Sequence, residues 1–488
     1  MERIVLSTGQ KALKINLNEN IYGTFAEIGA GQEVVRHFFR AGGASGTVAK
    51  TMSAYDKDFS DAIYGREIDG RYVTEARLRK MIEHEYNLIE QRLSRDKFPN
   101  KCYFTFSNTV ATINFTKKFK GHGWMGIRFQ LAPDQEPNDV IFHIRMKEEE
   151  AHLQQETIGV MGVNLIYGCF HIRNKPEELL RSLYDNISKY KVEIDMVHFE
   201  GPEFKNVDNR LMSLQLIKNG MTDAVIFGPE GKNILPAALL YKKNILALRG
   251  SFRPATKVNI DMIKKGYGYF VDERKVDHEN LVVLFEITLN NLKAEGEIDE
   301  QDFLDRAEIL CSLGQTVLIS NHQQYYKLVE YFTRYTDQRM GLIMGVTNLR
   351  ELFAEKYYRE LKGGILEAFG ILYSSDLKLY VYPSQPSKEE PIETSQSVKI
   401  HPRLQPLFDY LMFNKRIIDI ENYDPEILQI FSRDVLRKIR EGEEDWDRAL
   451  PAYVDNIIRD KRLFGYDPDN AKKKKEAEGE EEMEETKA

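Results

Sequence analysis

The sequence predicts an α/β protein built mainly from parallel, Rossmann-like sheets. From about residue 159 to 383, short apolar runs rich in Val, Ile, Leu and Phe alternate with segments of helical periodicity. Strands buried on both faces and joined by helices have this pattern. The spacers differ in length, which favours open, doubly wound sheets; a (β/α)8-like barrel is the alternative, because eight runs are present. The predicted strands are 163–170, 192–199, 223–228, 244–250, 281–287, 316–321, 340–346 and 377–383.

Residues 1–155 predict a separate α+β region. A strand at 21–28 leads through a glycine turn into a helix, and the segment 75–93 has apolar residues at helical spacing. Three further runs, at 102–106, 125–131 and 140–146, are bounded by turn residues and predict a meander or hairpin.

The rest of the chain divides by composition. The α/β body is predicted at 156–383, and the proline-containing segment 384–400 at its end predicts a linker or surface loop. Apolar stripes at helical spacing predict a helical C-terminal region at 401–468. The segment 469–488 is a lysine-rich then glutamate-rich tail, which is typical of disorder.

Composition narrows the class of protein. The 68 Lys and Arg against 76 Asp and Glu give a net charge of −8, which argues against a nucleic-acid partner. With three cysteines and ten histidines at no ligand spacing, we predict no metal site and no disulfide framework. No signal-peptide pattern and no long uncharged apolar run are present, so we expect a cytoplasmic protein without a membrane partner.

The first candidate site is the segment FAEIGAGQEV at 25–34. A strand that ends near an acidic residue, followed by Gly29 and Gly31 and then a helix, is similar to the first motif of Rossmann-like methyltransferases. The glycines would let the backbone approach a ligand at the helix N-terminus; a tight packing turn is the alternative. Glycines and basic residues downstream predict either an anion site or a subunit contact: Arg36, Arg40, Gly42, Gly43, Gly46 and Lys50.

The second candidate is GSFRPATKVN at 250–259, directly after a predicted strand. It resembles the opening of the signature of nicotinate-nucleotide adenylyltransferases, in which a strand runs into GSFxP and then HxGH opens a helix. In that family the turn and both histidines hold the triphosphate. Here Thr256 and Asn259 stand at the histidine positions, which makes catalysis uncertain. The candidate ligand-binding residues are Gly250, Ser251, Arg253, Thr256 and Lys257.

Over its length the chain also resembles a bacterial family of conserved proteins of unestablished role, some of which carry the adenylyltransferase label. The segments that carry this resemblance are IYGTFAEIGAGQEV, FSDAIYG, VDNRLMSLQL, RGSFRP and LKLYVYP. Polar residues near the ends of apolar runs predict one crevice if those ends converge. These residues are His171, Glu200, Arg249, Glu286, Asn321 and His322.

Two functions from different classes follow from these observations. The leading hypothesis is a protein that binds a phosphate-bearing or nucleotide ligand at a nucleotidyltransferase-like strand–turn–helix. The alternative is a self-assembling structural protein without enzyme activity, whose helices and glycine loop make contacts in a homo-oligomer. The sequence identifies no cofactor.

Overall fold

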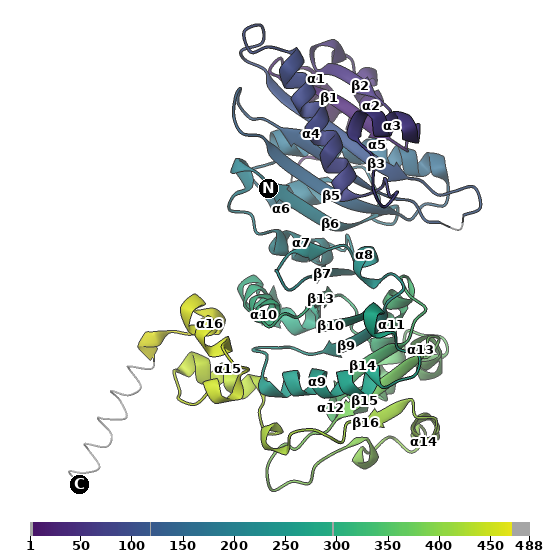
Figure 1. The fold of residues 1–488 in the computed structure, drawn as a ribbon, viewed down its shortest axis with the longest axis vertical. Coiled ribbons are helices and arrows are strands. Elements are labelled where there is room, and N and C mark those ends of the chain that lie inside the picture. Colours follow the sequence, from purple (N-terminus) through teal and green to yellow (C-terminus); the bar gives the residue numbers. More distant parts are fainter. Residues whose placement is uncertain (1–2, 118, 295–296, 471–488) are drawn as a thin grey trace, which may run out of the picture. The chain divides into compact units, whose positions relative to one another are not determined.

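The computed structural model describes residues 3–117, 119–294 and 297–470 (Figure 1). It divides into two compact units, Met1–Asp223 and Ala224–Ala488, which we call unit 1 and unit 2. Each unit has its own sheet. The division therefore lies after residue 223, whereas the sequence analysis placed it after residue 155.

Unit 1 is built on a six-stranded mixed sheet in the order β2-β1-β3-β4-β5-β6. Strand β1 pairs in parallel with β2 and β3, and the remaining neighbours are antiparallel. The predicted meander is thus confirmed as β3, β4 and β5. The strands are β1 (Ile21–Ile28), β2 (Val48–Met52), β3 (Cys102–Ala111), β4 (His122–Phe129), β5 (Asn138–Met146) and β6 (Val192–Glu200).

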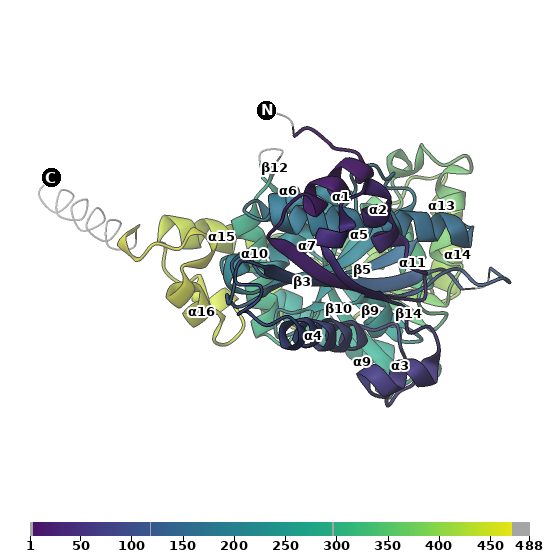
Figure 2. The ribbon, with the colours of Figure 1, turned by 90° about the horizontal axis from the view of Figure 1, so that it is seen from above.

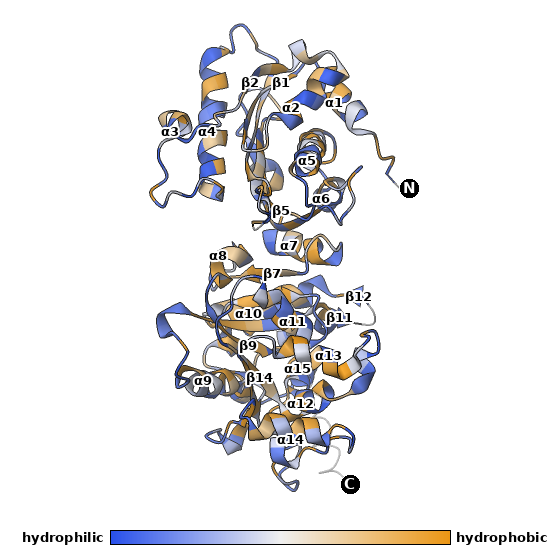
Figure 3. Cartoon of the chain, turned by 90° about the vertical axis from the view of Figure 1, so that its right-hand side faces the viewer, coloured by the Kyte–Doolittle hydropathy of each residue, from blue (hydrophilic) through white to orange (hydrophobic). Residues whose placement is uncertain are grey.

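Helices cover both faces of this sheet. Figures 2 and 3 show α3 and α4 on one side and α1, α2, α5 and α6 on the other. Helix α4 begins after Thr74, whose hydroxyl accepts a hydrogen bond from the Arg77 N–H, and it buries Leu78, Met81 and Ile82. The helix predicted at 75–93 is therefore confirmed as α4. The helices are α1 (Thr8–Asn16), α2 (Glu33–Ala41), α3 (Lys57–Tyr64), α4 (Glu75–Arg92), α5 (Ala151–His171), α6 (Pro176–Ser182) and α7 (Asn209–Lys218).

The predicted strand at 163–170 is wrong, because this run lies inside α5. Helix α5 packs against α1, α2 and β4 and is buried over much of its circumference. A helix that is apolar on all sides has the same sequence pattern as a strand buried on both faces. Gly162 permits the close packing, since a Cβ there would lie 2.4 Å from the side chain of Val34.

The predicted strand at 192–199 is confirmed as β6, but its partner differs from the expectation. It pairs antiparallel with β5 and so completes the sheet of unit 1 rather than starting a parallel body. This pairing is the reason that unit 1 extends past residue 155.

Unit 2 contains an eight-stranded sheet in the order β16-β15-β14-β9-β10-β13-β7-β8. The strands from β16 to β13 run parallel, and β7 and β8 add antiparallel at one edge. Numbered along the chain, the parallel strands have the Rossmann order 3-2-1-4-5-6. The α/β fold with open sheets is confirmed; the barrel is not. The strands are β7 (Ala224–Phe227), β8 (Asn233–Ile234), β9 (Asn244–Arg249), β10 (Leu281–Thr288), β13 (Val317–Ser320), β14 (Met340–Gly345), β15 (Leu377–Tyr382) and β16 (Ile417–Asp419), with a separate hairpin β11 (Lys293–Ala294) and β12 (Glu297–Ile298).

The helices of unit 2 lie on both faces of its sheet. The face that includes Ile245 and Leu342 packs on residues of α11 to α14, whereas α9 lies on the opposite face (Figure 3). On that opposite face Phe270 of α9 contacts Tyr380 of β15, with ring centroids 6.2 Å apart. The helices are α8 (Pro236–Leu240), α9 (Lys257–Val271), α10 (Glu300–Ser312), α11 (Tyr325–Thr333), α12 (Val346–Leu352), α13 (Gly364–Leu372), α14 (Gln405–Phe413), α15 (Ser432–Glu441) and α16 (Val454–Lys461).

The helical C-terminal region is confirmed as α14, α15 and α16, although β16 lies between the first two. The predicted disordered tail lies, from residue 471, outside the described residues. Within the described ranges, no helix combines the length and apolar character needed to cross a bilayer.

Candidate functional site

The strand order of unit 2 creates a switch point between β9 and β14. The chain leaves β9 for β10 on one side and leaves β14 for β15 on the other. Because these connections diverge, the carboxyl ends of the strands leave a crevice, where ligands of such sheets bind. A pocket of 380 Å³ lies there, which we call the switch-point pocket. Its lining residues are Arg249, Gly250, Ser251, Thr288, Asn290, Asn291, Gln323, Gln324, Tyr325, Asn348, Glu351, Leu352, Tyr357 and Tyr358.

A buried ion pair forms one wall of the switch-point pocket. Arg249, at the end of β9, donates from Nε and Nη2 to the two carboxylate oxygens of Glu286 on β10, both at 2.8 Å. It also donates to the carbonyl oxygens of His322 and Gln323, each at 2.8 Å. Burial alone would lower the Arg249 pKa, but the Glu286 carboxylate raises it, so the guanidinium stays charged. The positive charge of Arg249 is therefore compensated within the chain.

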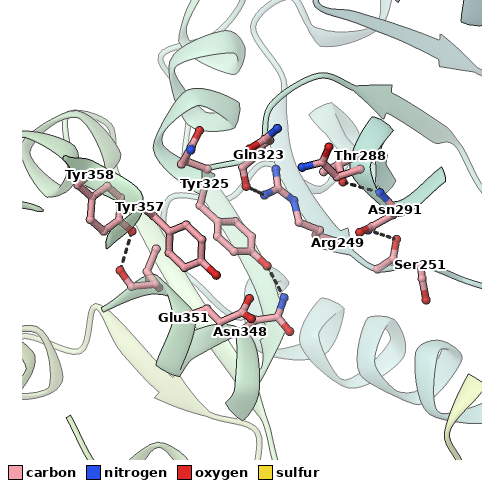
Figure 4. A pocket seen from close by; sticks show the side chains of 14 residues that line it. Arg249, Ser251, Thr288, Asn291, Gln323, Tyr325, Asn348, Glu351, Tyr357 and Tyr358 are labelled. Atoms are coloured by element: carbon pink, nitrogen blue, oxygen red, sulfur yellow. Dashed lines mark hydrogen bonds between the residues drawn. The ribbon is translucent and has the colours of Figure 1, made fainter. Parts of the chain in front are cut away.

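Tyrosine rings and amides form the other walls (Figure 4). The Arg249 guanidinium carbon lies 4.3 Å from the ring centroid of Tyr325, whose hydroxyl accepts a hydrogen bond from Asn348 at 3.0 Å. Figure 4 shows the Tyr357 side chain directed toward Tyr325 and Glu351. Tyr357 is 40% exposed, so part of its ring is accessible to a ligand, and the Lys356 ammonium lies 4.8 Å from the ring centroid. The lining is polar and carries no excess positive charge, because Glu286 neutralises Arg249 and the other charged lining residue is the Glu351 carboxylate.

A second hollow shares Gln323, Gln324 and Tyr357 with the switch-point pocket. We call it the cationic pocket; its volume is 490 Å³. Its three basic side chains, against one carboxylate, form no ion pair with any carboxylate in the described part of the chain. Its lining residues are Asn321, Gln323, Gln324, Lys327, Lys356, Tyr357, Arg359 and Glu360.

The predicted residues of the GSFRP segment divide into two groups. Gly250 and Ser251 line the switch-point pocket. Arg253 turns away, and its Nε donates to Asp302 of α10 at 2.5 Å. Thr256 is buried at the start of α9, where its N–H donates to the side chain of Asn259 at 2.9 Å. Thr256 and Asn259, which stand at the positions of the family's histidines, therefore cap the N-terminus of α9.

Lys257, the first residue of α9, is exposed and lies outside the linings of the described pockets. The turn itself is held by its carbonyl groups: Gly250 accepts from Asn291 at 3.2 Å and Ser251 accepts from Arg306 at 3.0 Å. Phe252 packs on Phe285, with ring centroids 5.1 Å apart. These contacts fix the turn and leave the Ser251 side chain exposed.

Gly29 and Gly31 lie in unit 1, between β1 and α2. Both have positive φ, and a Cβ at Gly29 would lie 1.7 Å from the Val110 carbonyl oxygen. The two carboxylate oxygens of buried Glu27 accept hydrogen bonds from the backbone N–H groups of Val34 and Val35 at 3.1 and 3.0 Å. A side chain of β1 thus occupies the helix N-terminus where an external anion would bind.

The predicted crevice is only partly assembled. Arg249, Glu286 and His322 are joined by hydrogen bonds, and Asn321 lines the cationic pocket. The other two predicted members are in unit 1: His171 ends α5, and Glu200 accepts two hydrogen bonds from Arg79. Sequence reasoning missed the tyrosines and amides. They lie in the segments that follow β10, β13 and β14, with Tyr357 and Tyr358 beyond α12, so strand order is the signal that would have found them.

No protein-family model matches the chain, and no curated protein sequence matches it significantly. Solved structures similar to part of it include the competence/damage-inducible protein CihA from Agrobacterium tumefaciens, at 13% identity and a TM-score of 0.24, covering 34% of this chain and 97% of that one. A CinA-superfamily protein from Klebsiella pneumoniae matches at 8% identity and a TM-score of 0.24, covering 33% and 96%. One from Escherichia coli matches at 10% identity and a TM-score of 0.22, covering 33% and 90%. TM-scores this low do not inform the function.

Proposed function

We propose that the protein binds a nucleotide at the switch point of unit 2, with its nucleoside part in the switch-point pocket and its phosphate over the cationic pocket. The observation that carries this proposal is the continuity of a tyrosine-lined pocket without excess positive charge with a pocket whose three cations form no ion pair in the described part of the chain. The two share Tyr357, Gln323 and Gln324.

The switch-point pocket has the chemistry to hold a base and a sugar. The accessible Tyr357 ring offers a stacking surface, and stacking of a base on an aromatic side chain is worth about 1–3 kcal/mol. The Glu351 carboxylate accepts hydrogen bonds from sugar hydroxyl groups, and the amides of Asn348 and Gln324 both donate and accept. The absence of excess positive charge in this lining disfavours a triphosphate there.

The cationic pocket supplies the phosphate contacts that the GSFRP turn lacks. Lys327 projects from α11, and Lys356 and Arg359 lie between α12 and α13. Arginine binds phosphate through paired N–H donors and lysine as a point charge. Since three cations face one carboxylate in this lining, a phosphate gains a net attraction, which solvent screens in part.

The test is titration calorimetry with the four ribonucleoside monophosphates, the corresponding nucleosides, and inorganic phosphate. At least one monophosphate should bind more tightly than both its nucleoside and phosphate alone. Tyr357→Ala should weaken the monophosphate and the nucleoside about tenfold. Lys327→Ala, which removes a cation of the cationic pocket that does not lie over the Tyr357 ring, should weaken the monophosphate about tenfold and leave the nucleoside unchanged.

The chain provides matched controls on α9. Tyr267 is 39% exposed, close to the 40% of Tyr357, and Lys264 is an exposed lysine outside both pockets. Tyr267→Ala and Lys264→Ala should leave every affinity unchanged. Binding of phosphate as tight as that of every nucleotide, or no binding of any nucleotide, would refute the proposal.

A further inference from the structure

The amino ends of the strands in unit 2 carry a second pocket, at the edge of the sheet opposite the switch point. Its volume is 660 Å³, and we call it the amino-end pocket. Arg339, Asp376 and Arg416 immediately precede β14, β15 and β16. The full lining is Lys275, Arg339, Leu366, Phe369, Gly370, Tyr373, Asp376, Lys378, Leu407, Tyr410, Leu411, Asn414 and Arg416.

One wall of the amino-end pocket is a charged network with an excess of cations. Asp376 accepts hydrogen bonds from Arg339 at 2.7 Å, from Arg416 at 3.2 Å and from Lys275 at 3.3 Å. Glu273 pairs with Arg339 and Lys378. The network therefore holds four cations, which are Lys275, Arg339, Lys378 and Arg416, against two carboxylates.

The excess charge lies on the accessible members of this network. The Lys275 side chain is 73% exposed and that of Arg416 is 36% exposed, whereas that of Arg339 is 10% exposed. Arg416 uses Nη1 for both of its side-chain hydrogen bonds, to Asp376 and to the Leu377 carbonyl oxygen, and its guanidinium carbon lies 6.0 Å from the Tyr373 ring centroid. Its Nε and Nη2 donate no hydrogen bond to any of the described residues, which leaves a donor pair of the kind that binds a carboxylate.

The facing wall is apolar and comes from α13 and α14. It presents Leu366 and Tyr410, which are 68% and 64% exposed, together with Phe369, Leu407 and Leu411. Large apolar side chains with this exposure, gathered around a concave site, are typical of a ligand or interaction surface.

We propose that the amino-end pocket binds a small organic anion whose carboxylate or sulfonate is attached to an apolar body. The anionic group would meet Arg416 and Lys275, and the apolar body would lie on Leu366 and Tyr410. A small inorganic anion leaves the apolar wall in water, and a neutral hydrocarbon leaves the cations without a partner. This site is separate from the proposed nucleotide site and does not depend on it.

The probe is 8-anilino-1-naphthalenesulfonate, an aromatic sulfonate whose fluorescence rises in apolar surroundings, titrated into the full chain. Arg416→Gln and Tyr410→Ala should each weaken its binding about tenfold. Both residues are at least one-third exposed, so these variants should keep the melting temperature of the parent. Arg274→Gln, an exposed arginine outside the pocket lining, is the matched control and should change nothing.

Competition then tests the chemical class of the ligand. Decanoate should displace the probe at a concentration at least tenfold below that of decanol or acetate. Only decanoate has both a carboxylate for the cations and an alkyl chain for the apolar wall. Tyr357→Ala, in the switch-point pocket, should leave probe binding intact. Equal displacement by decanol, or probe affinity that is unaffected by Arg416→Gln and Tyr410→Ala, would overturn the proposal.

Discussion

The buried pair of Arg249 and Glu286 makes the most direct prediction about unit 2. The Glu286 side chain is fully buried and that of Arg249 is 7% exposed. Glu286 accepts two hydrogen bonds from Arg249 at 2.8 Å and one from the Ser320 hydroxyl at 2.6 Å. Glu286→Gln keeps the shape of the side chain but removes its charge, so the Arg249 guanidinium remains buried without a counterion.

The cost of that change follows from the contacts that are lost. A glutamine can still accept from one donor of Arg249, but its amide nitrogen then faces the other donor. Breaking a buried ion pair from one side typically costs about 3–5 kcal/mol, so we expect Glu286→Gln to lower the free energy of unfolding of unit 2 by about 3 kcal/mol or more. Replacing both partners, as in Arg249→Met with Glu286→Leu, should cost less, because no charge is left unpaired. What remains is the loss of the Arg249 hydrogen bonds to the His322 and Gln323 carbonyl oxygens and of the acceptor for the Ser320 hydroxyl.

The assay is urea denaturation followed by circular dichroism, with the fluorescence of Trp446 as a probe within unit 2 in a Trp124→Phe background. Trp446 is buried, so unfolding of its surroundings changes its emission. The midpoints and slopes of the parent, the single variant and the double variant together give the free energies of unfolding. If Glu286→Gln costs less than about 1 kcal/mol, or if the double variant is the less stable one, the pair is not the buried, interdependent unit inferred from the structure.

Three further predictions concern the segments that the sequence singled out. Gly29→Ala should destabilise unit 1 far more than Gly31→Ala, measured by melting temperature, because both have positive φ but only the Cβ at Gly29 meets backbone, at 1.7 Å. Burial raises the pKa of Glu27 to about 7 from its ordinary 4.5. Its stabilising contribution is therefore full below pH 4.5 and falls by about 3 kcal/mol as pH rises through 7. Urea denaturation at pH 5 and pH 8 should show most of this loss, and Glu27→Gln should abolish it. Purified protein should form no dinucleotide from nicotinate mononucleotide and ATP in a chromatographic assay, since Thr256 and Asn259 supply no imidazole; turnover above background would contradict this.

The sequence predicted five of the six parallel strands of unit 2, because each of the five is a short apolar run bounded by turn residues, and it missed the three-residue β16. Strands β9, β10, β13, β14 and β15 all lie at predicted positions. It failed at α5, where burial on all sides removes the amphipathic period that separates helix from strand. It also could not assign β6 and β7 to their antiparallel partners, because partner choice depends on packing between distant segments.

The candidate site was harder to predict than the fold, for a related reason. The GSFRP segment was singled out by its similarity to a signature, yet only Gly250 and Ser251 reach the pocket. Tyr325 and Tyr357 belong to no short motif. They lie together because β13 and β14 sit on opposite sides of β9, an order that local sequence does not encode.

Strand order also explains why the other strand ends of the sheet differ from the switch point. At the carboxyl end of β15, the Tyr382 hydroxyl donates to Asp261 of α9 at 2.6 Å. Beyond it, Asp419 of β16 accepts from the Ser395 hydroxyl at 2.8 Å. There, neighbouring segments satisfy the polar groups that a ligand would otherwise meet. After β9 and after β14 the chain turns toward opposite faces of the sheet. The topology therefore places neither of these two connections over the gap between the strand ends. A ligand site therefore depends less on the GSFRP pentad than on the position of β9 in the sheet.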